Sequence, residues 1–273
     1  MRHAQKFRLL HQQDRPLILV NAWDAASARL LESSGAAAIA TTSAGIAWTL
    51  GYADGERMPM SDMLDACRRI CRSVQVPVSA DIERGFGETA AAAAGNVQAL
   101  LDVGIVGINI EDGIDGSTGR VHDLGVLAGQ IAAIRKVADA AGVALFINAR
   151  IDTYFAAASD PIARYEATVH RAQVYINCGA DGIFVPGLVD LEEIAKLAWT
   201  IGKPLNVYAG HSGVPPIAAL AQANVKRVSL GCGPLQASLA LTRRIAIEAI
   251  EKGTYDAMTA DMLSAKAVNA LFE

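Results

Sequence analysis

The sequence predicts an α/β protein, a TIM-type (β/α)₈ barrel with extra C-terminal helices, on three observations. Short apolar runs rich in Val, Ile and Ala alternate eight times with longer runs that have helical spacing. The apolar runs are continuous rather than alternating with polar residues, as expected for parallel strands covered on both faces. Glycines close most of the helical runs just before the next strand, as C-cap glycines do. Eight such units in about 250 residues match this barrel.

Each expected strand is an apolar run such as LILVNAW or DGIFVPG, and each expected helix is an Ala-, Leu- and charge-rich run such as SDMLDACRRICRSV. The strands are expected at 17–23, 37–45, 77–82, 106–112, 144–152, 181–187, 204–210 and 227–231. The helices are expected at 24–34, 61–74, 88–104, 124–142, 161–179, 190–202, 215–224 and 234–253. A doubly wound open sheet is the rival, but it usually has fewer strands and a Gly-rich phosphate turn after the first. Here the segment NAWDAAS stands at that turn, which favours the barrel.

No Pro-, Gly- or Ser-rich linker divides the chain, so we expect residues 1–273 to form a single barrel domain. Residues 1–16 are amphipathic and basic, and we expect a helical extension there. They lack the apolar stretch and small-residue cleavage site of a secretory signal. Residues 236–273 lie beyond the last strand, and we expect these C-terminal helices to pack on a partner subunit.

The composition of the chain excludes several classes of function. With 273 residues and 52% hydrophobic content, the chain can bury a large core. The net charge of -4, without a Lys/Arg block, argues against a nucleic-acid partner. No apolar stretch reaches the roughly 20 residues of a membrane span. The four cysteines (Cys67, Cys71, Cys178 and Cys232) form no C-x-x-C pair, which predicts free packing thiols and a cytoplasmic location.

Acidic residues gather where the expected strands end, and in such a barrel the chemistry sits at the carboxyl ends of the strands. Asp81 and Glu83 follow the third strand, Glu111 follows the fourth, and Asp54 lies in the loop after the second. Carboxylates converging in a low-dielectric mouth repel one another, and a divalent cation relieves this. Oxygen ligands without His or Cys indicate Mg²⁺, with Mn²⁺ as an alternative. A salt-bridge network at the barrel mouth is the other interpretation, and Asp54 could instead cap a turn.

Arg150 is a cation at the end of the otherwise apolar fifth strand. A guanidinium binds a carboxylate bidentately, so Arg150 predicts a small anionic substrate such as a 2-oxo acid or its enolate. The alternative is an internal ion pair with Asp152 or Glu111. Asn206, on the seventh strand, is either a substrate contact or a satisfied buried amide.

Two histidines are candidate acids or bases because imidazole titrates near neutrality. His122 lies in the loop after the fourth strand, and His211 lies just past the seventh. Either could equally be a solvated loop residue. Arg120, in the same loop as His122, is a candidate for closing over the anion, with a plain surface residue as the alternative.

These residues resemble the isocitrate lyase/phosphoenolpyruvate mutase superfamily, over about residues 17–235. The segments that carry the resemblance are TTSAGIAWTLGYADGE, SADIERGFG, GINIEDG, NARIDTYF, GADGIFVPG and PLNVYAG. The resemblance implies a (β/α)₈ barrel whose last helix swaps onto a neighbour in a homodimer or homotetramer, and a Mg²⁺-dependent reaction through a pyruvate-like enolate.

The resemblance also implies roles for particular residues. It implies that four carboxylates hold the metal, directly or through water: Asp54, Asp81, Glu83 and Glu111. It implies that the backbone amides of Ser43, Ala44 and Gly45 cradle the oxo-acid carboxylate, and that Arg150 and Asn206 contact the substrate.

Two departures from the family pattern narrow the expected activity. The third-strand motif D-x-D-T-G-[YF]-G reads DIERGFG here, with Glu83 for the second Asp and Arg84 for Thr. The isocitrate and 2-methylisocitrate lyases carry K-[KR]-C-G-H after the fourth strand, and its thiol protonates the enolate. Here the loop reads EDGIDGSTGRVHD, with Thr118-Gly119-Arg120 in place of Cys-Gly-His, so that lyase mechanism is disfavoured.

The remaining resemblance is to the oxaloacetate decarboxylases, hydrolases and related 2-oxo-acid lyases. We therefore expect a Mg²⁺-dependent lyase that acts on a small 2-oxo dicarboxylic acid through an enolate, with water able to supply the proton in a decarboxylation. The rivals are a phosphonopyruvate hydrolase or carboxyphosphonoenolpyruvate-type mutase, and a non-catalytic relative that binds an oxo acid.

Overall fold

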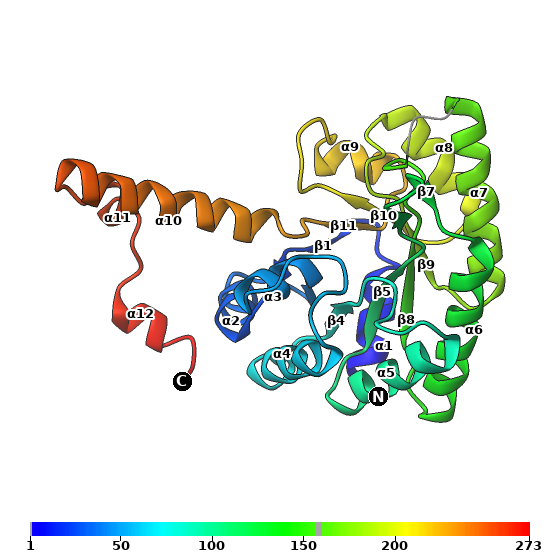
Figure 1. The fold of residues 1–273 in the computed structure, drawn as a ribbon, viewed down its shortest axis with the longest axis horizontal. Coiled ribbons are helices and arrows are strands. Elements are labelled where there is room, and N and C mark those ends of the chain that lie inside the picture. The colour runs from blue at the N-terminus through cyan, green and yellow to red at the C-terminus, as the bar shows by residue number, and fades with distance from the viewer. Residues whose placement is uncertain (1, 157–159) are drawn as a thin grey trace.

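A computed structural model describes residues 2–156 and 160–273, and its centre is a parallel sheet of nine strands (Figure 1). The spatial order of the strands is β1-β11-β10-β9-β8-β5-β4-β3-β2. Their bounds are β1 Leu17–Leu19, β2 Asn21–Ala22, β3 Ile39–Thr41, β4 Val78–Asp81, β5 Gly107–Glu111, β8 Phe146–Arg150, β9 Gly182–Phe184, β10 Leu205–Tyr208 and β11 Arg227–Ser229. All pairs between neighbouring strands are parallel, so every strand delivers its carboxyl end to the same side.

The sheet closes on itself through its first strand. Strand β1 pairs with β11 at one side, and β2 pairs with β3 at the other. Only Val20 separates β1 from β2. The two segments are therefore one interrupted strand, and the nine segments make the predicted eight-stranded barrel. The fold class is confirmed.

Helices cover the outside of this barrel (Figure 1). Those that follow the strands are α2 Ala25–Ser33, α4 Met60–Ser73, α5 Ala90–Asp102, α6 Leu124–Ala140, α7 Pro161–Asn177, α8 Leu191–Ile201 and α9 Ile217–Gln222. Several begin at residues whose side chains cap the first turn: Asp24, Thr89, Asp160 and Asp190 each accept a backbone N–H three residues on. Most buried aliphatic residues of sheet and helices form one core between the two layers, and a smaller separate cluster includes Leu17 and Leu19 of β1.

Two short elements near the carboxyl ends of the strands were not predicted. Helix α3, Ser43–Thr49, begins where the second strand was expected to continue, because Thr42 caps it and accepts from the amide of Gly45. The loop after β5 contains a small antiparallel hairpin, β6 (Ile114–Asp115) with β7 (Arg120–Val121).

The predicted N-terminal extension contains helix α1, Arg2–Leu10, and its buried residues are Ala4, Phe7 and Leu10. The ring of Phe7 enters the space that a side chain at Gly107 would fill: a Cβ there would lie 2.5 Å from Phe7 Cε1. Just past α1, the ring of His11 stacks on Phe146 at 3.9 Å between centroids. Because Gly107 and Phe146 begin their strands, α1 packs at the amino ends of the strands, opposite the mouth.

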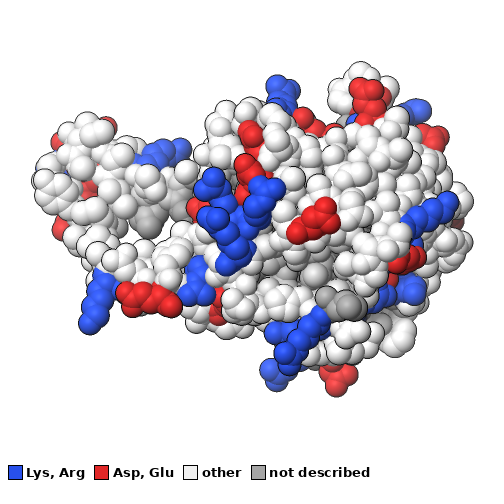
Figure 2. Space-filling view, turned by 90° about the horizontal axis from the view of Figure 1, so that it is seen from below, with Lys and Arg blue, Asp and Glu red and all other residues white. Residues whose placement is uncertain are grey.

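The C-terminal helices form an arm that leaves the barrel: α10 Gly233–Lys252, α11 Asp256–Thr259 and α12 Ala265–Asn269 (Figure 1). Along the twenty residues of α10, only Leu235 is buried. Apolar side chains lie exposed on the arm, among them Ile250 at 84%, Met262 at 62% and Leu239 at 51%. Figure 2 shows the arm at the left as a projection from the barrel.

No helix in the described ranges is long and apolar enough to cross a membrane. The four cysteines are free thiols, as predicted.

Candidate active site

A cavity of about 250 Å³ lies at the carboxyl ends of the strands. Its walls come from all around the barrel mouth and consist of Asn21, Thr42, Ser43, Ala44, Asp54, Asp81, Asn109, Arg150, Phe155, Phe184, Pro186, Tyr208, Ser229, Gly231 and Cys232. Five of the predicted site residues are therefore lining residues: Ser43, Ala44, Asp54, Asp81 and Arg150. The cavity is our candidate active site.

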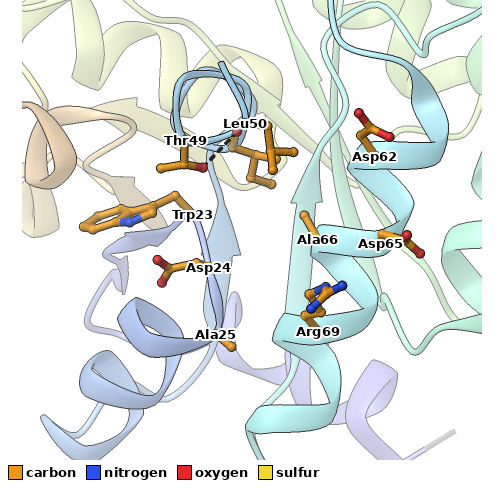
Figure 3. Close-up of a pocket in the computed structure, with 10 residues that line it drawn as sticks. Trp23, Asp24, Ala25, Thr49, Leu50, Asp62, Asp65, Ala66 and Arg69 are labelled. Carbon is orange, nitrogen blue, oxygen red and sulfur yellow. Dashed lines mark hydrogen bonds between the residues drawn. The ribbon is translucent and has the colours of Figure 1, made fainter. Parts of the chain in front are cut away.

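A larger groove, of about 520 Å³, runs beside the mouth between α2, α3 and α4 (Figure 3). Its polar side chains include Asp62, Asp65 and Arg69, which Figure 3 shows along α4. Asp62 accepts a hydrogen bond from the hydroxyl of Tyr52. None of the predicted site residues lines this groove, and it lies outside the barrel mouth.

Asp81, at the end of β4, is fixed by the start of α3. Its Oδ2 accepts from the hydroxyl of Ser43 at 2.7 Å and from the amide of Ser43 at 3.2 Å. Thr41 adds a third contact, because its hydroxyl accepts from the amide of Asp81. Of the three amides that the resemblance assigned to a substrate carboxylate, that of Ser43 thus binds Asp81 and that of Gly45 binds Thr42.

Arg150, at the end of β8, lies between two carboxylates. Its Nη1 is 2.7 Å from Oε2 of Glu111, its register partner on β5, and its Nε is 2.6 Å from Oδ1 of Asp152. Burial opposes the charged guanidinium, but Glu111 and Asp152 outweigh it and raise the pKa of Arg150. Burial raises the pKa of Glu111 well above its ordinary value, while Arg150 opposes that rise. The internal ion pair considered for Arg150 is therefore present in this structure.

Glu83 links two loops at the mouth. Its Oε2 accepts from the amide of Glu56 at 2.7 Å, and Oε1 of Glu56 accepts from the amide of Phe86 at 2.7 Å. All three residues have left-handed backbones, with φ of 49° at Glu83, 54° at Glu56 and 53° at Phe86. Non-glycine residues rarely adopt this conformation, and they do so where the surroundings over-determine it. The contacts hold the loop of Asp54 against the end of β4.

Asp54, Glu83 and Glu111 have raised pKa values, and nearby carboxylates contribute to each rise. Burial, then Asp81 and Asp54, raise the pKa of Glu83 to about 8. Burial raises the pKa of Asp54, with a smaller upward contribution from Asp81. After burial, Arg150 and Asp152, the carboxylates of Asp81 and Glu83 make smaller contributions that raise the pKa of Glu111. A dication relieves this mutual repulsion.

Within residues 2–156 and 160–273, however, no three His, Cys, Asp or Glu side chains are arranged to hold a metal ion directly. Mg²⁺ usually keeps several waters and takes one or two carboxylates. The donor set fits such a hydrated ion, because Asp54 and Asp81 are the two carboxylates among the described lining residues of the cavity.

Arg227, which the sequence analysis did not single out, lies beneath the cavity. It is 1% exposed, and its Nη2 donates to Oδ1 of Asn109, which also accepts from Nδ2 of Asn148. Burial lowers the pKa of Arg227 to about 9, while Asp81 raises it. Asn206 pairs in register with Arg227 and donates to the hydroxyl of Ser229, so it is buried below the lining residues. The one signal in the sequence for Arg227 was that a charged residue begins the apolar strand run RVSLG.

Three further predicted residues do not line the cavity. Arg120 is exposed on β7. His122 lies just past that strand, and its backbone carbonyl accepts a hydrogen bond from Arg171. His211 is exposed, with its ring 5.2 Å from that of Tyr208.

Comparisons with known proteins identify the family of this chain. The family model described as phosphoenolpyruvate phosphomutase matches residues 7–250. This chain belongs to the phosphoenolpyruvate phosphomutase family. The predicted resemblance is confirmed, since the family model covers most of the chain and 2-methylisocitrate lyases are among its relatives.

Three relatives illustrate the range of names within this family. A Mycobacterium tuberculosis protein of uncharacterized function is 37% identical over 85% of this chain and 84% of its own. The 2-methylisocitrate lyase of Aeropyrum pernix is 30% identical over 85% of this chain and 75% of its own. A solved structure from Burkholderia cenocepacia J2315, provisionally named a phosphonomutase, is 40% identical with a TM-score of 0.84, over 90% of this chain and all of that one.

Oxaloacetate acetylhydrolase in complex with 3,3-difluorooxalacetate is a more distant neighbour, with a TM-score of 0.87 and 20% identity over 98% of this chain and 92% of that one. At this identity the likeness supports the barrel fold alone.

Proposed function

We propose that this protein is a Mg²⁺-dependent lyase that acts on a small 2-oxo dicarboxylic acid through an enolate, by decarboxylation or another C–C cleavage. The observation that carries the proposal is one cavity with a carboxylate site at Asp81 and a guanidinium at Arg150. These two groups suit the two ends of a 2-oxo acid. The family of mutases and lyases supplies the reaction class.

The metal end would be held by Asp81 with Asp54, and through water by Glu83 and Glu111. The chemistry that Mg²⁺ supplies in such a site is Lewis-acid polarisation of the oxo group. Ser43 keeps Asp81 in place through two hydrogen bonds, and the link between Glu83 and Glu56 keeps the loop of Asp54 at the mouth.

The anionic end would be bound by Arg150. Its guanidinium is shared with Glu111 and Asp152, so its planar fork is held at the cavity wall before substrate arrives. A pre-organised guanidinium loses little side-chain freedom on binding a carboxylate. A cavity of about 250 Å³ is small for a drug-sized ligand and suits a short-chain acid.

The loop after β5 favours a decarboxylase or related oxo-acid lyase over a 2-methylisocitrate lyase. It carries Thr118-Gly119-Arg120 where the methylisocitrate lyases carry their acidic thiol, and residues 113–123 contain no cysteine. The named 2-methylisocitrate lyases among the relatives therefore do not determine the substrate.

A substrate panel tests the proposal. Two-oxo and 2-hydroxy di- and tricarboxylates are incubated with the protein, with and without Mg²⁺, and pyruvate, glyoxylate, oxalate and CO₂ are measured. We expect Mg²⁺-dependent CO₂ or C–C cleavage products from a 2-oxo dicarboxylate, abolished by EDTA. Turnover of 2-methylisocitrate alone would contradict the proposal.

A phosphonopyruvate hydrolase or phosphonomutase is the second candidate, supported by the name of the family model and of the Burkholderia relative. Phosphate release from phosphonopyruvate, with no turnover of carboxylic substrates, would favour it. A non-catalytic oxo-acid-binding role would be favoured if Asp81→Ala bound Mg²⁺ and oxalate as the wild type does.

We also infer that the arm packs on a second copy of the chain, in a homodimer or homotetramer with exchanged helices. Helix α10 buries only Leu235, and the large apolar side chains of the arm lie exposed on a single chain. A cytoplasmic location stays a prediction.

A further inference from the structure

The cavity contains a tyrosine and a cysteine side by side, and neither has a part in the proposed metal or anion site. Tyr208 is the last residue of β10. Cys232 lies three residues past the end of the neighbouring strand β11 and directly precedes α10. Both line the same cavity as Asp81 and Arg150. Cys232 was expected to be a packing residue, so its place in the cavity wall is a new observation.

Two glycines fix the ring of Tyr208. A Cβ at Gly210 would lie 2.4 Å from the ring and hydroxyl of Tyr208, and a Cβ at Gly231 would lie 2.6 Å from its Cε2. Real Cβ atoms do not approach other atoms so closely, so only glycine at both positions leaves room for the ring. Gly231 also has a φ of 55°, which glycine adopts without strain. The backbone is therefore shaped around this tyrosine, in the cavity wall.

Both groups hold their protons at neutral pH. Burial and then Cys232 raise the pKa of Tyr208 to about 12, while Arg150 lowers it. Burial raises the pKa of Cys232, whereas its contact with the Tyr208 hydroxyl lowers it and Asp54 and Asp81 raise it. The charged groups that face the pair are thus Arg150, Asp54 and Asp81. Such a pair can act as an acid, and the hydroxyl of Tyr208 is held at the wall by its ring.

We propose that Tyr208 is the catalytic acid that protonates the enolate carbon, with Cys232 as its hydrogen-bonding partner. The inference rests on the proposed function and names the proton donor that the loop after β5 lacks.

The step balances as a proton transfer. When the substrate C–C bond breaks, its electron pair becomes the enolate π bond and CO₂ or the other carbonyl product leaves. The enolate carbon then takes the proton from Oη of Tyr208. The tyrosinate takes the thiol proton of Cys232, and the thiolate is reprotonated by water. The positive charge of Arg150 favours the transient tyrosinate. No oxidant or further reactant is needed.

The other hydroxyl groups of the cavity wall, on Thr42, Ser43 and Ser229, are aliphatic alcohols and far weaker acids than a phenol. His122 and Arg120, predicted from the sequence, do not line the cavity. Among the described lining residues, the tyrosine and its cysteine neighbour are the side chains suited to this task.

Proton exchange tests the proposal without requiring the natural substrate. The wild type with Mg²⁺ and pyruvate in D₂O is expected to exchange the methyl protons, followed by NMR. Tyr208→Phe keeps the ring between the two glycines and removes only the hydroxyl. We expect exchange and turnover to fall by about 10²–10⁴-fold in this variant, the usual contribution of a general acid. Binding of oxalate, an enolate mimic, should stay within about twofold of wild type, measured by calorimetry.

Controls separate the acid from a structural role. Tyr165→Phe removes a hydroxyl that pairs with Thr200 away from the cavity, and it should exchange as the wild type does. Cys232→Ser retains a donor and should exchange faster than Cys232→Ala. Decarboxylation of 3-methyloxaloacetate in D₂O should give product of one configuration from wild type and both configurations from Tyr208→Phe.

The outcomes distinguish the two proposals. If the wild type neither exchanges pyruvate protons nor turns over any 2-oxo acid, the proposed function fails. If the wild type is active and Tyr208→Phe matches it, the proposed function stands and the assignment of Tyr208 is overturned. Loss of oxalate binding in Tyr208→Phe would also overturn it, because the hydroxyl would then be a binding contact.

Discussion

Nη1 of Arg150 lies 2.7 Å from Oε2 of Glu111, across two adjacent strands that end at the same cavity. The pair joins the proposed anion end of the site to the carboxylate cluster. A change at either residue should therefore affect both binding and stability.

Arg150→Lys should raise the KM for the 2-oxo acid by about 10- to 100-fold, because an ammonium cannot reproduce the bidentate contact (about 1.5–3 kcal/mol for a charged hydrogen bond). Arg150→Gln should in addition lose about 3–5 kcal/mol of stability, since Glu111 and Asp152 would remain buried without the cation. Steady-state kinetics and urea unfolding measure the two effects. Arg135→Gln, which breaks the ion pair with Asp181 away from the cavity, is the control and should leave KM unchanged.

Ser43→Ala should weaken Mg²⁺ binding by about 10- to 100-fold, as loss of an outer hydrogen bond to a metal ligand does. The hydroxyl lies 2.7 Å from Oδ2 of Asp81 and holds that carboxylate in place. Asp81→Asn should weaken binding further. Calorimetric titration with Mg²⁺ measures both. Equal affinity in wild type and Asp81→Asn would show that the metal, if bound, lies elsewhere.

Stability should fall as the pH falls below about 6.5, through His11. Burial, then Arg227, lower the pKa of His11 to about 3. Between these two pH values the unfolded chain binds a proton that the folded chain does not, so acid favours unfolding. The loss from pH 6.5 to pH 5 should be about 2 kcal/mol. His11→Gln should show a shallower pH dependence than the wild type in urea unfolding.

Gly107→Ala should destabilise the protein by about 1–3 kcal/mol, the usual cost of overpacking. The new methyl group would meet Cε1 of Phe7 at 2.5 Å and Oγ of Ser79 at 3.0 Å, so α1 would have to move. Gly129→Ala, in the middle of α6 with open space around it, should instead be neutral or stabilising by up to about 1 kcal/mol. Thermal unfolding compares them, and equal melting temperatures would argue against a tightly packed Phe7.

The wild type should be a dimer or larger in light scattering, with α10 on the partner. Ile250→Glu together with Leu239→Glu should shift it toward monomer, because both side chains are largely exposed on one chain and would be buried in the assembly. Lys252→Glu, a charge change at the end of the same helix, should leave the mass unchanged. A monomeric wild type would exclude the exchanged-helix arrangement.

Much of the barrel was readable from the sequence because its strands are continuous apolar runs and its helices have their own period and closing glycines. The mouth was readable in part: Asp81 and Arg150 stand out as charges at the ends of such runs. The contacts of these side chains could not be predicted. The partner of Arg150 could be Glu111, Asp152 or a ligand, and the choice depends on the register of two strands. Arg227 was missed because an isolated polar residue in a strand run gives no sign of which way it faces. Cys232 lies just past that run and was expected only to pack. The hydrogen bond between Glu83 and Glu56 depends on left-handed backbone conformations, which the local sequence does not predict.

The interrupted first strand has a consequence for how a newly made chain can fold. Leu17 and Leu19 hydrogen-bond with β11, so the seam of the ring joins the beginning of the sequence to residues 227–229. During synthesis, the ring stays open until nearly the whole barrel has left the ribosome. Such distant pairing slows folding. The exposed seam is then the point at which chaperones would be most needed, and a break in synthesis before residue 227 should yield an insoluble fragment rather than a smaller barrel.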